Sequence, residues 1–158
     1  MDSTWRMILG IAMRWLHIGS AITLLGGFVF ARFALAPAID SLPEGERRSF
    51  DSSVASRFRG LAYTVIGTAL ISGIYNYLTK SAFPPGYHMW IGIKFLLVLH
   101  IFAAAILYSL PDVAPATRSR RATGILISGA LVVLISAYLR WISVMPRGMP
   151  AGSAYPPV

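Results

Sequence analysis

Four apolar stretches, each long enough to cross a lipid bilayer as a helix, constrain this chain more than any other feature. A helix needs about 20 apolar residues to span the hydrocarbon core. Stretches of this kind cover 7–36, 60–79, 89–110 and 122–145. They take up most of the 158 residues, of which 56% are hydrophobic and only 13% charged. We therefore expect an all-α integral membrane protein, with one antiparallel four-helix bundle over 1–145 and lipid as its main solvent.

The positive charges are concentrated in two of the three connections between these spans. The connection between the second and third spans carries only Lys80, whereas the other two are rich in arginine: Arg47, Arg48, Arg57, Arg59, Arg118, Arg120 and Arg121. By the positive-inside rule the Arg-rich loops are cytoplasmic and both termini lie outside. The expected location is a bacterial-type inner membrane, crossed several times. Because orientation accounts for the net charge of +8, no nucleic-acid partner is expected.

Two segments outside the spans have patterns of their own. In 40–59, Phe50, Val54 and Phe58 recur at helical spacing, which favours a short amphipathic helix lying on the membrane. The outer tail, 146–158, has four prolines, two glycines and no helical period. Contact with another membrane subunit would order such a tail, so one expected class of partner is another membrane subunit.

Small and hydroxyl-bearing residues recur at four-residue intervals in two spans. The second span has Thr64, Thr68 and Ser72, and the fourth has Gly124 and Ser128. Stripes of this kind let helices approach closely in lipid and share hydrogen bonds. We interpret both stripes first as helix-packing surfaces.

Two histidines lie at matching depth on separate spans. His17 is about ten residues into the first span and His100 about eleven into the third, which places both near the bilayer centre. Two such imidazoles are what axial ligation of a b-type haem requires. Small residues beside them leave room for a macrocycle: Ser20, Gly27, Ala103, Ala104 and Ala105. The alternative is that both are merely hydrogen-bonded in a polar bundle core.

Cations lie outward of the histidines, on the side where the positive-inside rule expects few. Arg14 precedes His17 by three residues, Lys94 lies one and a half turns before His100, and Arg140 is placed in the same layer. An ionisable group at this depth costs at least about 2.5 kcal/mol, so it needs a partner or a function. Haem or porphyrin propionates would supply anions. Alternatively, the arginines only extend to the interface.

Methionines gather in the outer half of the chain, which raises the possibility of a copper site. They are Met7, Met13, Met89, Met145 and Met149. Thioethers select copper(I), and Met13 shares a helical face with His17. Methionine is also an ordinary filler of apolar helices.

The sequences Arg14-Trp15-Leu16-His17-Ile18, Gly26-Gly27-Phe28 and 93–100, which ends at His100, resemble those of one group of four-helix membrane proteins. The group comprises the CopD copper-resistance domain and the HemJ-type protoporphyrinogen oxidases. The HemJ resemblance implies b haem in the bundle, with His17 and Lys94 needed for activity and His100 as a third-helix histidine. The CopD resemblance implies copper uptake across the inner membrane. The aromatic pattern that usually follows the first histidine in HemJ-type chains is replaced here by 24–27.

Three functions therefore remain open from the sequence. The first is a b-haem-binding redox protein with His17 and His100 as axial ligands and Arg14 and Lys94 as anion partners, exchanging electrons with quinone or oxidising a porphyrinogen. In that case Lys94 is the candidate catalytic residue. The second is a copper transporter using Met13 and His17. The third is a cofactor-free accessory subunit of a larger membrane complex.

Overall fold

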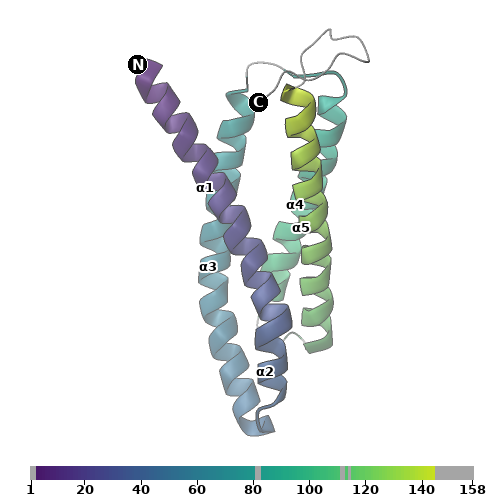
Figure 1. The fold of residues 1–158 in the computed structure, drawn as a ribbon. Coiled ribbons are helices and arrows are strands. Elements are labelled where there is room, and N and C mark those ends of the chain that lie inside the picture. The colour runs from purple at the N-terminus through teal and green to yellow at the C-terminus, as the bar shows by residue number, and fades with distance from the viewer. Residues whose placement is uncertain (1–2, 81–82, 111–112, 114, 145–158) are drawn as a thin grey trace, which may run out of the picture.

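The computed structural model describes residues 3–80, 83–110, 113 and 115–144, and in these the chain is helical, with no strand. Five α-helices and one π-helical turn follow one another (Figure 1): α1 (Ser3–Phe30), η1 (Ala31–Leu35), α2 (Ala36–Asp40), α3 (Glu44–Leu78), α4 (Tyr87–Tyr108) and α5 (Pro115–Val144). The all-α prediction is confirmed. The predicted tail contact at 146–158 lies outside the described residues.

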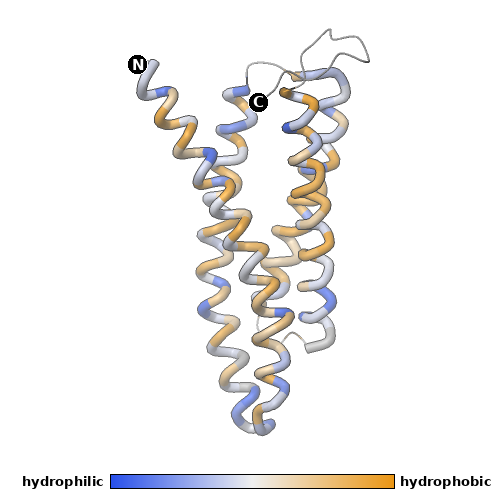
Figure 2. The backbone as a smooth tube through the Cα atoms, in the orientation of Figure 1, coloured by the Kyte–Doolittle hydropathy of each residue, from blue (hydrophilic) through white to orange (hydrophobic). Residues whose placement is uncertain are grey.

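The four long apolar helices that the sequence predicts are present. Four helices are long and apolar enough to cross a bilayer: Ser3–Asp40, Glu44–Leu78, Tyr87–Tyr108 and Thr117–Val144. Apolar residues follow each of them along most of its length (Figure 2). Many large apolar side chains face outward, among them Leu78, which is 73% exposed, and Leu96, which is 70% exposed. Such a surface suits lipid, because hydrocarbon tails solvate it as well as a protein core does.

The segment between the first two spans differs from its prediction. Residues 44–59 are helical, as expected, but they continue without a break into the second span and form the single 35-residue helix α3. Pro43 precedes the helix in an extended conformation, and no other proline follows within it. At the junction between 44–59 and the second span Gly60 is the one interruption among the helix-forming residues, and one glycine costs a helix only about 1 kcal/mol. A separate surface helix would have needed a stronger break than this.

A π-helical turn joins α1 to α2 within one continuous rod. In η1 the N–H of Ala36 bonds to the carbonyl of Ala31, five residues earlier. Pro37 follows directly and has no N–H to donate. The wider turn accommodates the loss of that donor and lets the helix continue to Asp40. Insertions of this kind occur often beside functional sites.

The helices form two antiparallel pairs, α1 with α3 and α4 with α5, which diverge towards the N-terminal end of α1 (Figure 1). Between the pairs, Leu25 of α1 lies directly against Gly129 of α5. The rings of Tyr77 and Phe95 join α3 to α4 with centroids 5.7 Å apart. The pairs are therefore held together at a few places rather than along a continuous seam.

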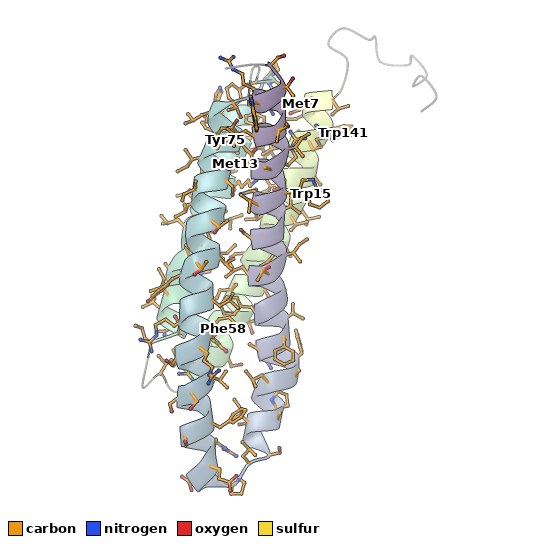
Figure 3. The ribbon with its side chains drawn as sticks, turned by 90° about the vertical axis from the view of Figure 1, so that its left-hand side faces the viewer. Met7, Met13, Trp15, Phe58, Tyr75 and Trp141 are labelled. Carbon is orange, nitrogen blue, oxygen red and sulfur yellow. The ribbon has the colours of Figure 1, made fainter. Side chains whose placement is uncertain are left out.

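Three aromatic rings form the main junction between the pairs, and Phe58 is labelled in Figure 3. Phe28 of α1 is fully buried. Its ring lies edge-on to Phe58 of α3, at 5.3 Å, and to Tyr108 of α4, at 5.1 Å. Phe58 and Tyr108 are themselves 5.8 Å apart. Edge-to-face rings at these distances attract each other beyond simple area burial. We call Phe28, Phe58 and Tyr108 the aromatic trio.

Replacing Phe28 tests this junction. We expect Phe28→Ala to lower the free energy of unfolding by about 3 kcal/mol, because it leaves a cavity and removes two ring contacts. The matched control is Phe30→Ala on the same helix, where the side chain is 61% exposed and faces away from the bundle. It should change the unfolding free energy by less than about 0.5 kcal/mol. Reversible unfolding in mixed detergent micelles measures both, and equal losses would contradict the packing described.

Candidate functional site

His17 lies between α1 and α3, with its ring nitrogen Nδ1 held by α3. Nδ1 is 3.1 Å from the carbonyl oxygen of Ala69 and 3.4 Å from the hydroxyl of Ser72. A carbonyl oxygen can only accept, so Nδ1 carries the proton in this hydrogen bond. In the neutral ring the lone pair is then on Nε2. The imidazole packs against Gly73, where a Cβ would lie 3.0 Å from its Cε1, so a larger residue there would require the ring to shift.

Lys94 is the second ionisable residue in the bundle interior. It is half-buried on α4, and its charge is close enough to interact with His17 across the two helix pairs. Among the described residues the Lys94 ammonium has no hydrogen-bond acceptor and no ion-pair partner. A cation at membrane depth without an acceptor is costly and is usually kept for a function. Of the ionisable residues named from the sequence within the spans, His17 and Lys94 are the two whose charges interact.

His100 is held in a similar way by the other helix pair. Its Nδ1 is 3.0 Å from the hydroxyl of Ser128, which is itself buried on α5. The ring approaches Gly124, where a Cβ would be 3.6 Å from Cε1. Unlike His17, His100 is exposed at the surface of the chain. Each pair thus presents one histidine whose Nδ1 is bonded to its neighbour helix.

The two histidines lie at similar depth by helical rise. The Tyr77–Phe95 ring contact fixes the level of α3 relative to α4. Gly73, which touches His17, lies four residues from Tyr77, or about 6 Å further into the bundle. His100 lies five residues from Phe95, or about 7.5 Å further in the same direction. The depth that the sequence predicts for the pair is consistent with these contacts.

The outer cations are placed differently from Lys94. Arg14 is exposed, and its position one turn outward of His17 does not bury it. Arg140 is also exposed, and its charge acts on Lys80. The Lys80 ammonium donates a 2.9 Å hydrogen bond to the Ser143 hydroxyl and lies 3.9 Å from the centre of the Tyr87 ring. Burial, and then repulsion from Arg140, lowers the pKa of Lys80. The rings of Trp90 and Tyr138 lie 5.2 Å apart and set the level of α5 against α4. By helical rise Arg140 then lies about 9 Å outward of Lys94, outside the predicted layer.

The methionines do not form a common site among the residues that can be placed. Met7 and Met89 are exposed, at 61% and 60%. Met13 is half-buried, and its carbonyl accepts a 3.2 Å hydrogen bond from Asn76 Nδ2 on α3. In Figure 3, Met7 and Met13 both lie along α1. Met145 and Met149 are outside the described residues.

The predicted stripe of small residues on α3 has two different roles. Thr64 and Thr68 donate to carbonyls one turn back in their own helix, at 3.0 and 2.9 Å, and so do not bond across helices. Ser72 also donates to its own helix, at 2.6 Å, but in addition lies 3.4 Å from His17 Nδ1.

Gly27 of α1 does not provide the open space predicted for a macrocycle, because a Cβ there would be 3.4 Å from the Phe58 ring.

The sequence did not identify the partners that hold the histidines. These are the Ala69 carbonyl, Gly73 and Ser128, and Asn76 adds a second bond between α1 and α3. Among the described residues no group of three or more His, Cys, Asp or Glu forms a metal cluster. No family model matches the chain, and neither a curated protein nor a solved structure shows significant similarity to it. The resemblance to CopD and HemJ-type proteins therefore rests on the residues quoted for it.

The missing acceptor at Lys94 predicts a stability gain on substitution. In ligand-free protein, Lys94→Met should raise the free energy of unfolding by on the order of 1–2 kcal/mol, because it removes a cation that the interior does not compensate. The control is Lys80→Met, which removes a lysine that does have partners and should not stabilise. Unfolding in mixed detergent micelles measures both. A lower stability of Lys94→Met would mean that Lys94 has a partner within the bundle.

Proposed function

We propose that this chain is a membrane-embedded redox protein that binds a b-type haem between its two helix pairs. The observation that carries the proposal is the hydrogen bond from His17 Nδ1 to the Ala69 carbonyl. It orients the imidazole and leaves the lone pair of Nε2 as the available metal ligand. Haem-ligating and metal-ligating histidines are held in the same way, with the other nitrogen bonded to a carbonyl.

His100 would be the second histidine that holds the haem in this proposal. Its Nδ1 is held by the Ser128 hydroxyl, and its depth agrees with that of His17. The two histidines belong to different helix pairs, so a planar macrocycle ligated by both would also link the pairs. When bound, the haem supplies one-electron exchange between ferric and ferrous iron.

Lys94 provides the positive charge for an anionic group beside His17. It is half-buried and without an acceptor among the described residues, which suits a propionate or an anionic substrate. Arg14 lies further outward, where it can add a longer-range attraction for the same charges. The reaction is electron exchange with a quinone or oxidation of a porphyrinogen. The resemblance to HemJ-type proteins favours the second, with Lys94 as the catalytic residue.

The main test is an absorbance spectrum of the purified protein, oxidised and dithionite-reduced, after expression with ample haem. We expect a Soret band and a reduced alpha band, and a loss of at least about tenfold in bound haem for His17→Ala. His100→Ala should leave a five-coordinate, high-spin haem or remove it. His88→Ala is the matched control, because His88 is exposed beside Phe83 at the start of α4 and should not change haem binding.

A featureless spectrum from wild-type protein would overturn the proposal and leave copper binding or an accessory role as the alternatives. With haem bound, turnover distinguishes the two reactions. Porphyrinogen oxidation that is lost in His17→Ala and Lys94→Met, but kept in His88→Ala, would identify an oxidase. A reversible redox couple without turnover would identify an electron carrier.

The orientation in the membrane is part of the same proposal. The end formed by α2, the start of α3 and the start of α5 carries most of the arginines, which supports a cytoplasmic location for that end in a bacterial-type inner membrane. The N-terminus and Lys80 would then lie outside.

The absence of cysteine from the sequence makes this orientation directly testable. We expect Thr79→Cys to react with a membrane-impermeant maleimide in intact cells, because it is exposed at the outer end of α3. Ser49→Cys, exposed near the start of the same helix, should react only after the cells are opened. The reverse pattern would invert the topology.

A further inference from the structure

A second site is present at the arginine-rich end of the bundle. A cavity of about 200 Å³ lies where α1 passes through η1 into α2, against α3 and the start of α5. This is the lower end of the bundle in Figure 1, opposite the N-terminus. The aromatic trio borders it through Phe58 and Tyr108. The cavity is therefore separate from His17 and Lys94.

Three arginines from three different elements line this cavity. They are Arg32 of η1, Arg47 of α3 and Arg118 of α5, and the carboxylate among the lining residues is that of Asp40. Asp40 lies 3.9 Å from Arg47. Asp40 is thus paired with Arg47, and Arg32 adds a positive charge that no described carboxylate pairs with. The arrangement is electrostatically suited to an anion.

Part of the hydrogen-bonding capacity at this cavity is not used by the chain. Arg47 donates through Nη2 to the carbonyls of Asp40 and Leu42, yet its Nε is buried and has no partner in the described structure. Arg32 lies over the ring of Phe33, at 5.7 Å, and makes no ion pair with a described carboxylate. Guanidinium groups with open donors bind phosphate through paired hydrogen bonds.

The rest of the cavity wall is apolar. Leu35, Val54, Ala55 and Phe58 contribute to it beside the arginines. A ligand that fills both parts needs an anionic head and a hydrocarbon portion. The π-helical turn contributes one residue of each kind to this wall, Arg32 and Leu35.

We infer that this cavity binds the phosphate of an anionic phospholipid, with the first acyl carbons against the apolar wall. Basic pockets between membrane helices at the cytoplasmic face are suited to such headgroups. The positive-inside rule explains why arginines are present in these loops, but it does not require that several of them line one cavity. Arg57 and Arg120 show the difference, because they are exposed and do not line it.

The experiment uses the full chain in detergent with phosphatidylglycerol, phosphatidylcholine or inorganic phosphate as the probe. Native mass spectrometry counts bound lipid, and the thermal midpoint reports stabilisation. We expect phosphatidylglycerol to bind in preference to phosphatidylcholine, and Arg32→Gln to reduce its affinity about fivefold. Arg57→Gln removes the same charge from an exposed position on α3 and should leave the affinity unchanged.

Arg32→Lys keeps the charge but loses the paired donors, so its affinity should fall between those of the wild type and Arg32→Gln. Without lipid, the thermal midpoint of Arg32→Lys should match that of the wild type. A lower lipid affinity of this variant would then reflect the lost donors and not a folding defect. Equal losses in Arg32→Gln and Arg57→Gln would overturn the inference by showing only general surface attraction. Equal binding of phosphatidylcholine, or full stabilisation by inorganic phosphate alone, would overturn the assignment to an anionic lipid.

Discussion

The absence of water from the hydrocarbon core is the constraint on which this structure depends. A polar group there must find its partner within the protein. The hydroxyls of α3 meet this requirement by bonding to their own helix one turn back. His17 meets it through a backbone carbonyl that already serves the helix ladder of α3. Lys94 does not meet it within the described chain, which is why we propose the interior around these two residues as the ligand site.

Packing divides the molecule into parts of different character. The aromatic trio and the Leu25–Gly129 contact join the helix pairs at the arginine-rich end and the middle of the bundle. Towards the other end, α1 leaves α4 and α5 (Figure 1). The proposed haem site lies in the interior and the lipid site beyond the aromatic trio. Three rings thus separate two regions with different chemistry.

The spans could be predicted from the sequence because hydropathy is a local property that needs no knowledge of contacts. The break between the first two spans was harder, since the charged residues of 44–59 are as compatible with α3 as with a surface helix. The choice of His17 and Lys94 followed from the cost of ionisable groups in lipid. Their partners could not be predicted, because the Ala69 carbonyl has no distinguishing side chain and helix rotation decides which residue faces it. For the same reason the exposure of Arg14 and His100 was not foreseen.

The division into two helix pairs has a consequence for how the protein is made. Each pair is a helical hairpin that can enter the bilayer as a unit, and α1 with α3 precedes α4 with α5 in the order of synthesis. His17 finds its carbonyl as soon as the first hairpin closes, whereas Lys94 arrives only with the second. The proposed interior site would therefore be completed at the last step of assembly. Before that step His17 and Lys94 belong to separate hairpins, and the charge of Lys94 acts on His17 only after the hairpins join.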